Sequence, residues 1–191
     1  MNVDGESPSQ LARSQRARRE RILAAVLELA AEGGYDAVQV REVAARANVA
    51  LRTIYNYYES RENLLYEAMM EWRRTVANES VANVSGTTLE ERLLSLLRHN
   101  FEVFADAPKL FEVFNRLELR PEDVDPVIYK TMMGASDELF ADVDPEFADD
   151  LRLILGRFIY GTMSLAAQGH LPVEDVWPDI ERMVRRVTAS H

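Results

Sequence analysis

The chain has 191 residues, 47% of them hydrophobic and 28% charged, a composition that predicts a globular protein and excludes bulk disorder. It has no cysteine and no apolar run of about 18 residues, which excludes disulfides, thiolate metal sites and a membrane-spanning helix. The net charge of −10 belongs to residues 76–191, because residues 1–75 carry 11 basic and 11 acidic side chains.

Residues 1–14 are predicted to form a disordered polar and basic tail, since they combine Gly, Ser and Pro with little hydrophobicity. No apolar segment follows that would make a secretory signal, and the absence of cysteine fits a cytoplasmic protein. A basic cluster at the start of the chain is suited to phosphate groups, although a solvated tail explains it equally well. The cluster comprises Arg13, Arg16, Arg18, Arg19 and Arg21.

The next segment predicts three helices in quick succession. Apolar residues recur at helical spacing over residues 16–32, and Gly33-Gly34 ends this helix. A second short helix surrounds Val43, and a third covers residues 51–58. Between them stands Asn48, which tolerates the left-handed backbone of a tight turn. Two short helices joined in this way form a helix-turn-helix, which can place its second helix in the major groove of DNA.

The third of these helices has two different faces. Helical spacing puts Ile54, Tyr55 and Tyr58 on one side and a polar set on the other. In that polar set, Arg52 can bind guanine and Asn56 can bind adenine. Thr53 can also contact bases, whereas Tyr57 and Arg61 suit phosphate oxygens. An ordinary solvent-facing surface would show the same pattern.

The rest of the chain predicts a larger helical bundle. Thr87 and Glu90 have the spacing of a capping box, which would open the helix that follows. No convincing strand pattern occurs, so the predicted fold is all-α with about nine helices. The predicted domains are the tail, a helix-turn-helix domain at 15–60 and an effector-binding and dimerisation domain at 61–191. The helices expected in the last domain cover residues 61–81, 87–105, 108–117, 121–143, 145–168 and 173–189.

The stretch GGYDAVQVREVAARANVALRTIYNYYESRENLL resembles the signature of the TetR family of bacterial helix-turn-helix repressors. The resemblance covers about 50 residues, and GGYDAVQ is also similar to actinobacterial members that control lipid or sterol catabolism. Ala50 stands where the family usually has a capping Ser, and Tyr58 stands where it usually has Phe. The matching positions are Gly34, Tyr35, Val40, Val43, Ala44, Ala47, Val49, Thr53, Ile54, Tyr55, Tyr57, Ser60, Glu62, Leu64 and Leu65.

This resemblance implies a homodimeric transcriptional repressor that binds a palindromic double-stranded DNA operator and is released by a small-molecule effector. Leu51 lies near the core side by helical phase, but the family usually exposes this position, where it could touch a thymine methyl. The expected DNA-binding residues are Gln39, Arg41, Leu51, Arg52, Thr53, Tyr55, Asn56, Tyr57 and Arg61.

The resemblance also implies that the last two long helices form a four-helix dimer interface. Each of them carries an apolar stripe, and small glycines on the first permit close approach of another helix. Both stripes could instead serve only the core of a single chain. The expected interface residues are Ile154, Phe158, Thr162, Leu165, Trp177, Ile180 and Val184.

The middle helices are rich in Phe and Met, which suits an apolar effector, either lipid-like or polycyclic. These residues could equally be ordinary core. Asn100 interrupts an apolar stripe, so its amide either is satisfied within the core or orients a ligand. The expected ligand-binding residues are Asn100, Phe101, Phe104, Phe111, Phe114, Tyr129, Met132, Met133 and Phe140.

An enzyme is the main alternative of another class. The chain has no Gly-rich phosphate loop, nucleophile elbow or metalloprotease motif, and its three histidines are scattered. We therefore expect no catalysis, no metal and no cofactor. A second alternative is an interaction module that has lost DNA binding, and the polar set on the third helix argues against it. A DNA-binding regulator is the preferred interpretation.

Overall fold

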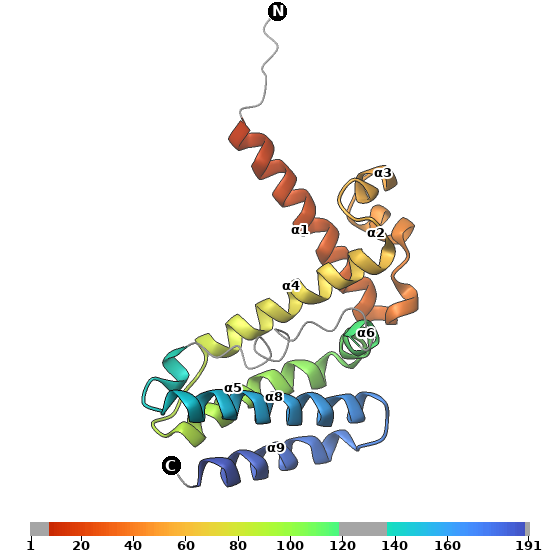
Figure 1. Cartoon of the computed structure of the whole chain (residues 1–191). Coiled ribbons are helices and arrows are strands. Elements are labelled where there is room, and N and C mark those ends of the chain that lie inside the picture. The colour runs from red at the N-terminus through yellow and green to blue at the C-terminus, as the bar shows by residue number, and fades with distance from the viewer. Residues whose placement is uncertain (1–7, 119–136, 190–191) are drawn as a thin grey trace, which may run out of the picture. The chain divides into compact units, whose positions relative to one another are not determined.

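The computed structural model describes residues 8–118 and 137–189, and every regular element in these ranges is helical (Figure 1). The all-α prediction is therefore confirmed. The elements are α1 (Pro8–Gly33), the 3-10 turn η1 (Tyr35–Ala37), α2 (Val40–Arg46), α3 (Leu51–Tyr55), α4 (Arg61–Ala82), α5 (Leu89–Asp106), α6 (Pro108–Glu118), η2 (Asp137–Phe140), α8 (Pro145–Ala167) and α9 (Val173–Thr188). None of the described helices is long and apolar enough to span a membrane.

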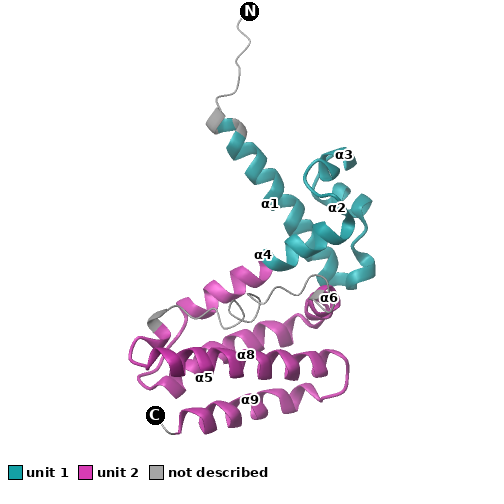
Figure 2. Ribbon diagram, viewed as in Figure 1, with its two compact units in different colours: residues 1–71 teal, residues 72–191 magenta. Residues whose placement is uncertain are grey.

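The chain divides into two compact units, Met1–Glu71 and Trp72–His191, and the division falls within α4 (Figure 2). The boundary expected from the sequence, after residue 60, coincides instead with the start of α4. The difference arises because the first half of α4 packs into the core of the first unit through Leu64, Leu65 and neighbouring residues. Apolar periodicity identifies this face, but it does not say which core covers it.

The core of the first unit is built on α1. Ile22, Val26 and Ala30 recur on one face of this helix and are completely buried. The helix begins at Pro8, so residues 8–14 are helical rather than part of the disordered tail that the sequence predicted. This segment has too few apolar residues to show helical periodicity, but its Arg, Gln and Ala are good helix formers. An ion pair between Arg16 and Glu20, 2.9 Å apart, supports it further.

The second unit is a bundle in which α5 and α8 each pack along α9. The buried stripe of α9 consists of Val176, Ile180, Val184 and Thr188. Between α6 and α8, Ser164 Oγ donates a hydrogen bond of 2.9 Å to Oδ1 of the buried Asn115. The expected helix over residues 121–143 lies largely outside the described residues, and its described end forms η2.

Candidate DNA-binding surface and ligand pocket

The turn between α2 and α3 is closed by Asn48, which has a φ of 52°. Asn accepts this left-handed conformation more readily than most residues, as the sequence analysis predicted. The backbone N–H of Val49 donates to the Ala44 carbonyl, 3.0 Å away, and completes the turn. At the start of α3, Ala50 has the extended backbone of an N-cap but offers no side-chain cap. The local sequence thus fixes the geometry of a helix-turn-helix.

The short helix α3 is anchored by one face and exposes the other. Ile54 and Tyr58 are 1% and 3% exposed, as predicted. Tyr55 is 55% exposed, which corrects the phase argument that placed it on the core side. The helix ends at Tyr55 rather than near residue 58, so the angular pattern of a longer helix does not apply. Leu51, Arg52 and Asn56 are exposed as well, and together with Tyr55 they form what we call the α3 surface.

Other predicted DNA-binding residues lie around this surface. Gln39 and Arg41 are exposed at the start of α2, and the amide of Gln39 donates to the Asp36 carbonyl at 2.9 Å. Thr53 and Tyr57 are half-buried, and the Tyr57 ring lies against that of Tyr58. These positions leave polar atoms of both helices at the surface of the first unit.

Arg61 makes its described contacts within the first unit. Its Nε donates to the Val38 carbonyl at 2.6 Å, and its guanidinium also donates to the Tyr35 carbonyl. The guanidinium lies over the Tyr35 ring, 4.2 Å from the centroid, and the side chain is only 19% exposed. Arg61 therefore holds the loop before α2 in place, and we drop it from the DNA-binding set. Sequence spacing could not reveal these carbonyl partners.

Ion pairs hold the helices of the first unit together. The guanidinium of Arg46 on α2 lies 2.6 Å from Glu32 on α1, and this hydrogen bond lowers the pKa of Glu32. Arg19 on α1 lies 2.7 Å from Glu67 on α4. The Tyr58 hydroxyl nearby is buried, and this burial raises its pKa. At least one arginine of the basic cluster, Arg19, therefore makes an ion pair within the unit.

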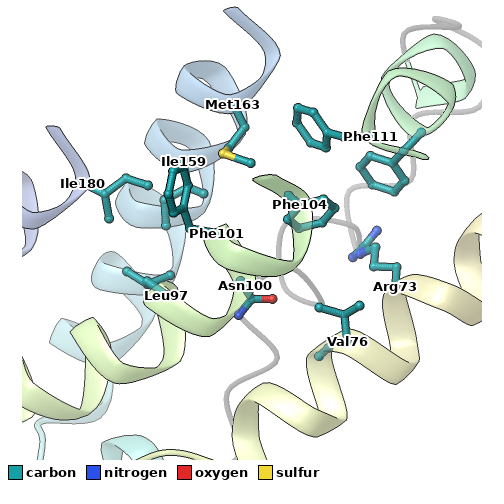
Figure 3. A pocket seen from close by; sticks show the side chains of 12 residues that line it. Arg73, Val76, Leu97, Asn100, Phe101, Phe104, Phe111, Ile159, Met163 and Ile180 are labelled. Carbon is teal, nitrogen blue, oxygen red and sulfur yellow. The ribbon is translucent and has the colours of Figure 1, made fainter. Parts of the chain in front are cut away.

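The second unit contains a small cavity of about 30 Å³ lined by residues of five helices (Figure 3). The predicted residues Asn100, Phe101, Phe104, Phe111 and Phe114 all line it. Beside it lies a more open cleft of about 260 Å³ between α5, α6, α8 and α9. Four side chains line both spaces and separate them, namely Phe101, Phe104, Phe111 and Met163.

Sequence reasoning missed part of the cavity wall. Arg73, Val76 and Ala77 of α4 line it at helical spacing, and Ile180 of α9 closes one side. Nothing in the sequence singles out this face of α4, because an arginine there indicates a solvent-facing surface. Three further lining residues were not predicted from the sequence, namely Leu97, Ile159 and Met163.

Of the other predicted ligand-binding residues, Phe140 is described and does not line the cavity. Phe140 is buried elsewhere, beneath the guanidinium of Arg152 on α8, so it belongs to the core of the second unit. Tyr129, Met132 and Met133 lie outside the described residues. Asn100 lines the cavity while its amide donates to the Leu96 carbonyl at 2.9 Å.

The predicted dimer residues separate into two groups. Ile154 and Leu165 are 45% and 48% exposed, and Phe158 is half-buried between them along α8. Thr162, Ile180 and Val184 are buried within the chain, and Trp177 packs against Phe101 and Arg98. For Ile180 and Val184 the intramolecular alternative therefore holds, since α5 covers the stripe of α9.

Comparison with known proteins gives matches over both units. Residues 22–68 match the family model for bacterial regulatory proteins of the tetR family, and residues 86–187 match the tetracyclin repressor-like C-terminal domain. The chain is 40% identical over 117 residues to the HTH-type transcriptional repressor KstR of Mycolicibacterium smegmatis, covering 60% of this chain and 57% of that one. It is 38% identical to KstR of Rhodococcus jostii, covering 54% and 48%. The chain spans about half the length of the curated relatives it matches.

Solved structures share the fold. A TetR transcriptional regulator from Rhodococcus sp. RHA1 superposes with a TM-score of 0.68 at 23% identity, covering 91% of this chain and 97% of that one. A tetR-family regulator from Streptomyces coelicolor gives 0.66 at 17% identity, covering 92% and 82%. At these identities the likeness concerns the fold alone.

Proposed function

The chain belongs to the tetR family of bacterial regulatory proteins, and on this premise we propose that it is a transcriptional repressor that binds a palindromic operator as a homodimer. The observation that carries the proposal is the α3 surface. A five-residue helix anchored by Ile54 presents Leu51, Arg52, Tyr55 and Asn56 to solvent, and such a set suits the major groove. The similarity to KstR, a protein named as a repressor, supports repression.

Within this proposal, Arg52 reads guanine and Asn56 reads adenine, because each side chain can form two hydrogen bonds to its base. Leu51 and Thr53 offer apolar contact to thymine, while Gln39, Arg41 and Tyr57 bind phosphates and set the register. Tyr55 is also exposed enough to reach the DNA. Arg61 acts indirectly, by fixing the loop that orients α2.

Arg52→Ala should weaken operator binding by about 1–3 kcal/mol and relax the sequence preference at one position in each half-site. A selection from random DNA duplexes measures both effects. Arg41→Ala is the control, because loss of a phosphate contact should weaken all sequences alike and reduce the salt dependence by about one unit of slope. An unchanged selected motif for Arg52→Ala would remove this residue from base reading.

The dimer that we propose uses an exposed apolar face of α8, made of Ile154, Phe158, Gly161 and Leu165. These positions share one side of the helix, and a Cβ at Gly161 would meet nothing within 4 Å among the described residues. Such a face permits close approach of the same helix from a second copy. Two-fold symmetry then places two α3 surfaces on successive half-sites of a palindrome.

The effector that we propose is an apolar small molecule that enters the second unit and favours a conformation with lower affinity for the operator. The aromatic lining of the cavity supports it. The volume of about 30 Å³ holds roughly one water, whereas ligand pockets commonly measure about 300–1,000 Å³. A ligand must therefore displace the four side chains that separate the cavity from the cleft of about 260 Å³.

The small cavity also favours a second candidate, a repressor controlled by its own abundance. Phe104→Trp distinguishes the two, because a larger ring fills the space between cavity and cleft. If an effector regulates the protein, this variant should keep its DNA binding and lose the response to an acyl or polycyclic compound. If no such compound changes the operator affinity of the unmodified protein, regulation by abundance is the better account.

A further inference from the structure

The cavity combines an apolar wall with one buried charge. Among the described residues that line it, Arg73 alone is charged, and it is only 5% exposed. Its guanidinium carbon lies 5.8 Å from the centroid of the Phe114 ring. Figure 3 shows the nitrogen atoms of Arg73 pointing from α4 toward the space beside Phe104. The charge thus faces the interior of the second unit and not the surface.

A buried guanidinium is costly unless anions or hydrogen-bond acceptors surround it. Arginine has five N–H donors in a planar arrangement, so it can hold a bidentate carboxylate in addition to a partner within the protein. The other polar lining residue, Asn100, is neutral and donates one of its two amide N–H groups to the Leu96 carbonyl, so it attracts an anion less strongly than a guanidinium does. Of the residues described as lining this cavity, Arg73 is therefore the one best suited to an anionic group.

We infer that the pocket recognises an amphipathic carboxylate, with its carboxylate on Arg73 and its apolar body among the phenylalanines. The inference rests on the proposed effector site and narrows its ligand class. Neutral apolar molecules of the same shape cannot accept charge-assisted hydrogen bonds from the guanidinium and therefore bind more weakly. The body of the ligand extends past Phe104 and Met163 into the cleft, whose far side includes Ala166 and Val176.

Tryptophan side chains of the second unit can report ligand binding through their fluorescence. The chain has two tryptophans, and both lie against rings of the cavity. The Trp72 ring is 5.2 Å from that of Phe104, and the Trp177 ring is 6.0 Å from that of Phe101. A ligand that moves Phe101 or Phe104 changes the environment of these indoles. Tryptophan fluorescence therefore measures binding without DNA.

The test compares dodecanoate with dodecan-1-ol, which has the same chain and no charge, in fluorescence titrations of the full chain at neutral pH. The unmodified protein should bind dodecanoate more tightly by about tenfold or more, because a hydrogen-bonded charge pair distinguishes them. In Arg73→Met this preference should disappear. Arg74→Met, at the exposed neighbouring position, is the matched control and should keep the preference.

Equal affinity of the unmodified protein for both probes, or binding of neither, overturns the inference without any variant. A preference that persists in Arg73→Met also overturns it. If Arg73→Met does not fold, Arg73→Lys keeps the charge, loses the bidentate geometry and should show a reduced preference. Operator binding is measured separately. Preferred dodecanoate binding without any change in operator affinity refutes release by an effector but leaves this inference standing.

Discussion

Single side chains decide how stable the start of α3 is. Ala50 occupies the N-cap of α3 with a φ of −67° and a ψ of 144°, and no side chain caps the first turn. The first backbone N–H groups of a helix have no partner within it, so a hydroxyl at this position would satisfy one of them. A helix of five residues has little else to stabilise its start.

We predict that Ala50→Ser raises the free energy of unfolding by about 1 kcal/mol, since Ser accepts a hydrogen bond from the first turn of α3. Urea denaturation followed by circular dichroism measures the change. Ala45→Ser introduces the same hydroxyl at an exposed position inside α2, where it caps nothing and should give no gain. Equal stability of Ala50→Ser and the unmodified protein would show that water already satisfies this N-terminus.

At the scale of elements, the start of α5 shows how a cap sets helix register. The sequence suggested a capping box at Thr87 and Glu90, but the structure forms it one residue later. Thr88 accepts from the Glu91 N–H at 3.2 Å, and Glu91 accepts from the N–H groups of Thr87 and Thr88 at 2.7 and 3.1 Å. The repeat TTLEE allows both registers locally.

The same cap predicts a pH dependence. The backbone N–H groups of Thr87 and Thr88 lower the pKa of Glu91 from 4.5 to about 2. Because the folded pKa lies below the unfolded one, this stabilisation is complete above pH 4.5 and is lost as the pH falls toward 2. The stability difference between the unmodified protein and Glu91→Gln should therefore shrink over this window in denaturant titrations at several pH values.

Glu90→Gln serves as the control for that experiment, because Glu90 lies 3.7 Å from Arg185 and is not part of the cap. It should not reproduce the pH dependence of Glu91→Gln. If the stability difference for Glu91→Gln stays constant from pH 4.5 to 2, the carboxylate charge contributes nothing to the cap.

For the whole molecule, the proposed dimer depends on residues that the single chain leaves exposed. Ile154→Glu or Leu165→Glu should keep the fold, since both side chains are nearly half exposed. In the dimer, each change would bury a charge in an apolar contact, at a cost of about 3 kcal/mol or more for each copy. Analytical ultracentrifugation should show monomers, and affinity for a palindromic site should fall.

Val173→Glu is the matched control, because Val173 is 50% exposed but lies at the start of α9 and is not one of the four α8 residues of the proposed face. This variant should remain dimeric. Unmodified protein that sediments as a monomer at micromolar concentration would refute the dimer, and Ile154→Glu that remains dimeric would refute this face. Ile180→Glu is uninformative, since Ile180 is 2% exposed within the chain and the change would disrupt its core.

The sequence by itself determined the helical fold, the helix-turn-helix and the family. These depend on local features, such as the apolar spacing of α1, the left-handed Asn48 and the burial of Ile54, which short stretches of chain encode. Tertiary structure decided that Arg61 binds the carbonyls of the loop before α2 and that Arg73 faces a cavity. It also buried Ile180 within the chain while leaving Ile154 exposed. Periodicity shows that a helix has an apolar or a charged face, but which distant element covers that face depends on packing across the whole unit.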